Sequence, residues 1–205
     1  VEIRQLLAAT VKEGEIDYRA KFFYKVLYSG VKSLRIDLPA ELAPRVTNLT
    51  SALREKAIDP PPADLAQGYV AWSFTGETEL IGEGAIELTW TTKLGELAVG
   101  ADVAVTVPRL VPRDMNRAWG QIVVAKVETI DVQDDPKQQD GLRPIDPQLD
   151  LIAPSVPGAA LAYEFHADWK LTLTAIRYQA ERIKPISVER ALLRELLGAK
   201  REDIS

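Results

Sequence analysis

The fold is decided by residues 18–28, which read Tyr-Arg-Ala-Lys-Phe-Phe-Tyr-Lys-Val-Leu-Tyr. Every even position carries an apolar or aromatic side chain, while Arg19, Lys21 and Lys25 occupy odd positions. Successive residues of a strand point to opposite sides, so this alternation gathers the apolar side chains on one face. The pattern predicts a strand with one buried face.

The alternation continues beyond this stretch. After Ser29-Gly30 it resumes at Leu34, Ile36 and Leu38 and stops at Pro39. Glycine permits the positive φ angles of tight turns, so the two segments predict a β-hairpin.

Further strands are predicted by the same criterion along the rest of the chain. They cover residues 69–74, 86–91 and 103–107, and 122–132 as one central strand. Residues 161–175 carry apolar side chains at odd positions and predict either one long strand or a hairpin that bends near Ala167-Asp168. Short alternating segments without regular helices between them predict a mainly β fold, an antiparallel β-sandwich with one or two short peripheral helices.

Two segments are candidates for those helices. Residues 47–56 have a possible apolar face and end before the Pro60-Pro61-Pro62 run, which no helix can continue through. Ser187 is a suitable N-cap, and leucines at helical spacing follow it up to Gly198.

The domain organisation has two possible interpretations. Residues 133–158 hold five of the thirteen prolines and several aspartates, a composition typical of a loop or linker. The first interpretation is a single β-rich module, 1–205, excised from a larger protein. The alternative is a main lobe at 1–132, an acidic Pro-rich linker at 133–158, and a second lobe or the start of the next repeat at 159–205. Similarity between residues 1–7 and 188–193 suggests that the parent protein is repetitive.

Composition excludes several classes of function. A net charge of −5 argues against a nucleic-acid surface. There is no apolar run of about 18 residues, so membrane insertion as a helix is not expected. With no cysteine and one histidine, thiol chemistry and cysteine–zinc sites are excluded, and we predict no metal and no cofactor. The absence of cysteine is compatible with the cytoplasm and with the periplasm or cell surface, and we favour the latter.

The best candidate binding residues are Arg109, Arg113, Arg117 and Trp119, in a stretch that resembles a loop. Guanidinium groups bind carboxylate or phosphate through forked hydrogen bonds, and a tryptophan adds a large stacking surface. These groups suit an anionic or sugar ligand, or the carboxylates of a protein partner.

Other constellations are weaker candidates. Glu164, His166 and Asp168 would project to one side of a regular strand. Asp131 to Asp140 supplies oxygen ligands of the kind that calcium prefers, without the EF-hand spacing.

No catalytic signature is present: the sequence lacks G-x-S-x-G, the phosphate loop, G-x-G-x-x-G and H-E-x-x-H. We therefore predict a non-catalytic structural or binding module of a larger, bacterial extracytoplasmic protein. Its partners would be other domains of the parent chain or other proteins. The alternative is a carbohydrate-binding or carbohydrate-processing β-sandwich, with an exposed Trp72 or Trp119 beside two converging carboxylates.

Overall fold

The computed structural model describes residues 1–153 and 156–178, and it is almost entirely built of β-strands. The predicted helix after Ser187 lies outside the described residues. The strands are β1 (Glu2–Val11), β2 (Glu15–Val31), β3 (Leu34–Pro39), β4 (Thr47–Asn48), β5 (Arg54–Ala57), β6 (Tyr69–Thr75), β7 (Leu80–Lys93), β8 (Asp102–Thr106), β9 (Val111–Arg113), β10 (Arg117–Lys126), β11 (Ile130–Asp134), β12 (Arg143–Pro144), β13 (Ala159–Phe165) and β14 (Thr172–Arg177). Two single turns of 3-10 helix, η1 (Ala43–Arg45) and η2 (Pro136–Gln138), lie between strands.

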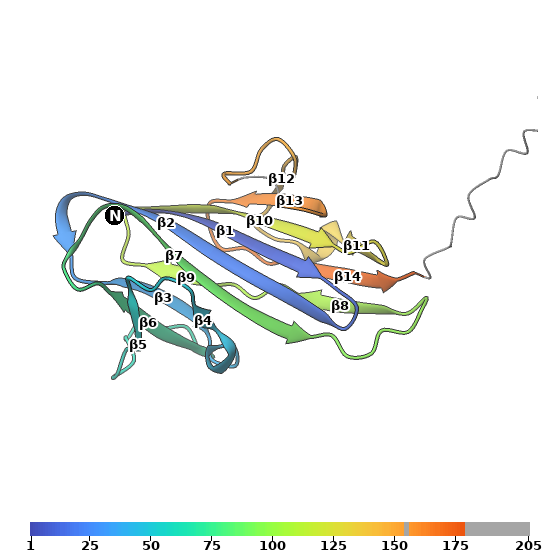
Figure 1. The fold of residues 1–205 in the computed structure, drawn as a ribbon, viewed down its shortest axis with the longest axis horizontal. Coiled ribbons are helices and arrows are strands. Elements are labelled where there is room, and N and C mark those ends of the chain that lie inside the picture. Colours follow the sequence, from blue (N-terminus) through green and yellow to red (C-terminus); the bar gives the residue numbers. More distant parts are fainter. Residues whose placement is uncertain (154–155, 179–205) are drawn as a thin grey trace, which may run out of the picture.

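The strands form a sandwich of one large sheet and two small ones. The large sheet has seven strands in the order β12-β13-β10-β1-β2-β7-β4. Opposite it lie a three-stranded sheet, β11-β14-β8, and a four-stranded sheet, β5-β6-β3-β9 (Figure 1). The prediction of a mainly β, sandwich-like fold is confirmed. The pair β1–β10 is parallel, while the other pairs among the described strands are antiparallel.

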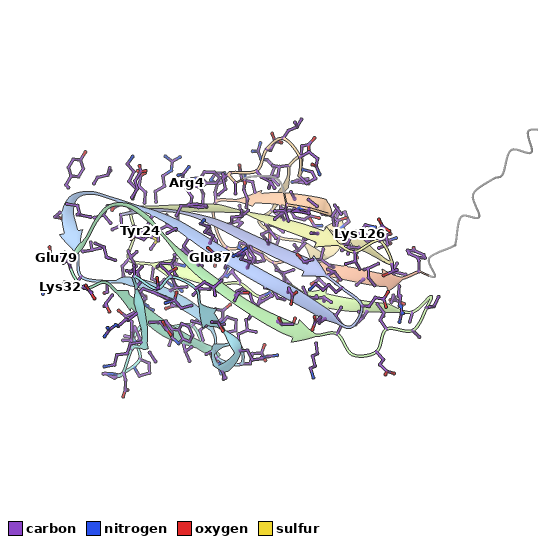
Figure 2. The ribbon with its side chains drawn as sticks, viewed as in Figure 1. Arg4, Tyr24, Lys32, Glu79, Glu87 and Lys126 are labelled. Carbon is purple, nitrogen blue, oxygen red and sulfur yellow. The ribbon has the colours of Figure 1, made fainter. Side chains whose placement is uncertain are left out.

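One apolar core lies between the two layers. Leu7, Phe22 and Leu88 contribute from the large sheet, Ile36 from the four-stranded sheet and Leu173 from the three-stranded sheet, and each is at most 2% exposed. The even face of residues 18–26 is turned inward as predicted, with Tyr24 only partly buried, whereas Tyr28 is exposed. Figure 2 shows Arg4 on the outer side of the large sheet and Tyr24 on the side of the smaller sheets.

The predicted hairpin between residues 18–28 and 34–38 is wrong. Strand β2 pairs with β1 and β7, whereas β3 pairs with β6 and β9 in the other layer. The chain crosses the sandwich at residues 32–33 instead of turning back on itself. The even residues of both strands still enter the same core, which explains why the alternation is continuous.

The chain also passes between the two layers within residues 122–132 and within residues 161–175, and both predictions for these segments are wrong. Residues 122–132 form two strands, because β10 ends at Lys126 in the large sheet and β11 begins at Ile130 in the three-stranded sheet. Residues 161–175 are neither one strand nor a hairpin, since β13 and β14 belong to opposite layers. The predicted helix at 47–56 is also wrong: β4 and β5 occupy its ends, and of its expected apolar face Leu53 is buried but Leu49 is 48% exposed.

The described residues of the segment 133–158 begin in the three-stranded sheet, and Asp150 and Ile152 lie against the outer face of the large sheet. The segment contains the end of β11, η2 and β12, and β12 pairs with β13. The side chain of Gln121 on the outer face donates to the Asp150 carbonyl (2.9 Å) and accepts from the Ile152 amide (2.8 Å). This cover explains why the outward-facing Val123 is 0% exposed. Within the described residues no helix has the length and apolarity needed to cross a membrane.

Candidate functional site

Trp119 lies on a strand and not in a loop, so the prediction of a loop-like stretch around it is wrong. It is the third residue of β10, where it pairs with Arg4 of β1. On its other side β10 pairs with β13 only from Gly120, opposite Phe165, the last residue of β13. The first residues of β10 therefore extend beyond the end of β13.

A hollow of about 150 Å³ occupies this corner of the sandwich. Residues from four parts of the chain line it: Gln5 of β1, Arg109–Pro112 before and within β9, Ala118 and Trp119 of β10, and Phe165–Trp169 at the end of β13. The walls are mainly apolar. A cavity of about 150 Å³ is the size that accommodates a benzene ring in other proteins.

Four of the residues that line this hollow carry aromatic rings, which form two pairs. The Trp119 and His166 rings are stacked, with centroids 6.0 Å apart, and Phe165 and Trp169 are tilted at 5.5 Å. Gly120 makes the close packing possible, because a Cβ atom there would lie 2.6 Å from Phe165 Cζ and 2.9 Å from Gln5 Cβ. Any larger residue at 120 would displace one of the lining side chains.

Two polar side chains in the lining of the hollow, those of Gln5 and Arg109, are relevant to what it could bind. Gln5 is 2% exposed, and its amide nitrogen has no hydrogen-bond partner among residues 1–153 and 156–178. A buried donor without a partner costs about 1–3 kcal/mol. Arg109 Nη1 lies 2.9 Å from Asp168 Oδ1, and the Asp168 side chain is 88% exposed.

The predicted group of Glu164, His166 and Asp168 is only partly brought together. His166 Nε2 lies 2.9 Å from Glu164 Oε1, which also accepts from Arg143 Nη2 at 2.8 Å. These contacts, that of His166 first, hold the pKa of Glu164 below its ordinary value. Asp168 contacts Arg109 instead, so Glu164, His166 and Asp168 do not converge on one point.

Arg113 belongs to an ionic cluster around the buried Asp37 of the four-stranded sheet. Its Nε donates to Asp37 Oδ2 at 2.9 Å, and Arg35 donates to both Asp37 oxygens at 2.8 and 2.9 Å. Arg35 also donates to Asp64 at 2.8 Å. Hydrogen bonding to Asp37 raises the pKa of Arg35, and Arg35 lowers the pKa of Asp64. Arg113 is thus a structural partner of a carboxylate that is 1% exposed.

Arg117 lies beside Trp119 on the outer side of the sheet. Together with Arg4 and Phe23 they line a second hollow, of about 340 Å³. Arg4 lies 5.9 Å and Lys21 5.1 Å from the Phe23 ring centroid. Of the four predicted binding residues, the structure therefore places Arg109 and Arg117 on either side of Trp119 and Arg113 elsewhere.

The acidic loop uses its carboxylates internally. Asp134 Oδ2 accepts from Tyr163 Oη at 2.5 Å and from Gln139 Nε2 at 2.6 Å. Asp131 lies 3.4 Å from Lys126 Nζ. In the described part of the chain no three His, Cys, Asp or Glu side chains are grouped as metal ligands.

Sequence analysis missed Gln5 and the stacking of His166 on Trp119. A signal for Gln5 was present, because it shares the odd positions of β1 with Ile3 and Leu7, both of which are buried. A polar residue in an inward-facing row is a candidate for a functional group.

Comparisons with known proteins do not indicate a function for this chain. No protein-family model and no curated protein matches the sequence. Among solved structures, the seventh ScaB type I cohesin from Pseudobacteroides cellulosolvens is 12% identical, with 62% of this chain and 94% of that chain covered and a TM-score of 0.31. Yeast LTA4 hydrolase in complex with bestatin is 8% identical, with 85% and 28% covered and a TM-score of 0.31. Likenesses of this strength assign no function.

Proposed function

We propose that this chain is a non-catalytic binding module of a larger, extracytoplasmic protein, and that its ligand enters the hollow beside Trp119. The observation that carries the proposal is Gln5, a residue of the lining whose buried amide nitrogen has no hydrogen-bond partner in the described part of the chain. Nearly all buried donors in folded proteins are satisfied, so an orphan donor in the lining of a hollow suggests a missing acceptor.

The walls support a ring-sized ligand. Trp119, Phe165 and Trp169 offer aromatic surface, and Leu110 and Val111 add apolar contact. Ligand sites typically combine such apolar walls with a few placed polar groups. Gln5 and Arg109 supply those groups here.

The carbohydrate alternative is less well supported. It requires a tryptophan beside two converging carboxylates, but Glu164 and Asp168 contact different cations. Contacts with other domains or proteins would use the exposed apolar side chains of Leu27, Tyr28 and Ile81 rather than the hollow.

A ligand titration tests the proposal. Two-dimensional amide NMR spectra of the labelled chain are recorded with benzoate, benzyl alcohol, cyclohexanol and glucuronate in turn. At least one ring compound should shift the side-chain amide signals of Gln5 and the indole signal of Trp119. The Trp119→Phe variant should bind that compound more weakly, whereas Trp72→Phe, a matched change outside the hollow, should not. Absence of any shift at Gln5 with all four compounds would contradict the proposal.

A further inference from the structure

Among the described residues that line the hollow beside Trp119, Arg109 is the one permanent cation. Its side chain is 25% exposed, whereas the Asp168 side chain that pairs with it is 88% exposed. The pair therefore joins a cation at the rim of an apolar hollow to a carboxylate that remains in water.

Such a pair is easily exchanged. Ion pairs between exposed groups contribute little, since water and salt compensate both charges. Asp168 would return to full hydration at almost no cost if another carboxylate replaced it. A guanidinium group binds a carboxylate through two parallel hydrogen bonds, which gives the replacement both affinity and orientation.

We infer that the ligand is a carboxylate carried on an apolar six-membered ring, and that its carboxylate takes the place of Asp168 on Arg109. This inference rests on the proposed function. The ring would occupy the hollow.

The walls favour an aromatic or saturated hydrocarbon ring over a sugar acid. A uronic acid would bring several hydroxyl groups against apolar walls that include Leu110, Val111 and Phe165. Burying a hydroxyl without a hydrogen bond is unfavourable. The structure therefore assigns benzoate-like acids, and not uronates, to this site.

Calorimetric titrations with benzoate, benzyl alcohol and glucuronate test the inference on four variants. Asp168→Asn frees Arg109 and should tighten benzoate binding about two- to five-fold, the worth of an exposed pair. Arg109→Gln should weaken benzoate binding at least about ten-fold, the worth of a charged hydrogen bond. Neither change should alter binding of the uncharged benzyl alcohol. Asp102→Asn and Arg54→Gln, exposed residues outside the lining, are the matched controls.

The outcomes separate the two proposals. If benzoate and benzyl alcohol bind equally well and neither variant changes the affinity for benzoate, the site binds rings and the inference is wrong. A preference for glucuronate over benzoate also overturns it. If none of the three compounds binds and cyclohexanol does not bind either, the proposed function fails together with the inference.

Discussion

At the scale of single residues, two glutamines provide a matched comparison. Gln5 and Gln121 are both 2% exposed and lie on neighbouring strands. Gln121 is hydrogen-bonded through both ends of its amide, whereas the Gln5 nitrogen has no partner within the residues that the structure describes. Leucine has a similar size and carries no polar atoms, so the same substitution should have opposite effects at the two positions.

We expect Gln5→Leu to raise the free energy of unfolding by about 1–3 kcal/mol, because it removes an unsatisfied buried donor. Gln121→Leu should lower it by a similar amount, because the Asp150 and Ile152 backbone groups lose their partner. Urea denaturation of the two variants measures both changes. A loss of stability in Gln5→Leu would show that the Gln5 amide is satisfied in the free protein.

Two of the predicted binding residues, Arg113 and Arg117, should differ in how much they contribute to stability. Arg113→Ala removes a donor from the buried Asp37 and should destabilise the fold by about 1–3 kcal/mol. Arg117→Ala should leave the melting temperature nearly unchanged, because Arg117 is exposed. Thermal melts of both single variants provide the measurement. Equal melting temperatures would mean that Arg35 alone is sufficient to satisfy Asp37.

At the scale of elements, the hydrogen bond between Tyr163 and Asp134 connects the two layers. Asp134 ends β11 in the three-stranded sheet, and Tyr163 lies on β13 in the large sheet. The hydroxyl of Tyr163 lowers the pKa of Asp134 from its ordinary value of 3.8, while burial raises the pKa of Tyr163. A carboxylate with a depressed pKa stabilises the folded state above its unfolded pKa, and that contribution is lost as the pH falls through the folded value.

We therefore expect Asp134→Asn to lose less stability than the wild type when the pH is lowered from 5 to 2. Tyr163→Phe should show the same flattening, because it removes the donor that depresses the pKa. Urea denaturation at several pH values gives the comparison. Wild type and Asp134→Asn curves of identical shape would exclude this coupling.

The sequence predicts which residues form strands better than it predicts which strands pair with each other. The faces of β2 and β7 follow from alternation, because both strands are half-buried. Strand β1 was missed, since Leu6 on its outer face is buried as well, so the alternation fails at Leu6-Leu7. The hairpin was misassigned because alternation reports which face is buried but not which strand lies alongside.

The same limit applies to the site. Arg109 and Trp119 were predicted from residue chemistry alone, and both line the hollow. Gln5 and His166 join them through the parallel pairing of β1 with β10 and the end of β13 at Phe165. Those contacts join residues far apart in the sequence, as in the pairs of Gln5 with Gly120 and of Gly120 with Phe165, and no local pattern carries that information.

At the scale of the whole molecule, we propose that the chain unfolds as one unit. Strands β13 and β14 follow the acidic Pro-rich segment, yet they pair with β10 and with β8 and β11, which precede it. Calorimetry should give a single transition with equal calorimetric and van't Hoff enthalpies. Two resolved transitions would favour the separate-lobe interpretation.

The central claim is that the hollow beside Trp119 is a binding site completed by its ligand. Intermolecular nuclear Overhauser effects in the presence of benzoate test it most directly, because they report contacts within about 5 Å of the ring protons. The account predicts contacts from those protons to the Gln5 side-chain amide and to the Trp119 and Phe165 rings. Contacts confined to the outer hollow around Arg4 and Arg117, or no contacts at all, would contradict it.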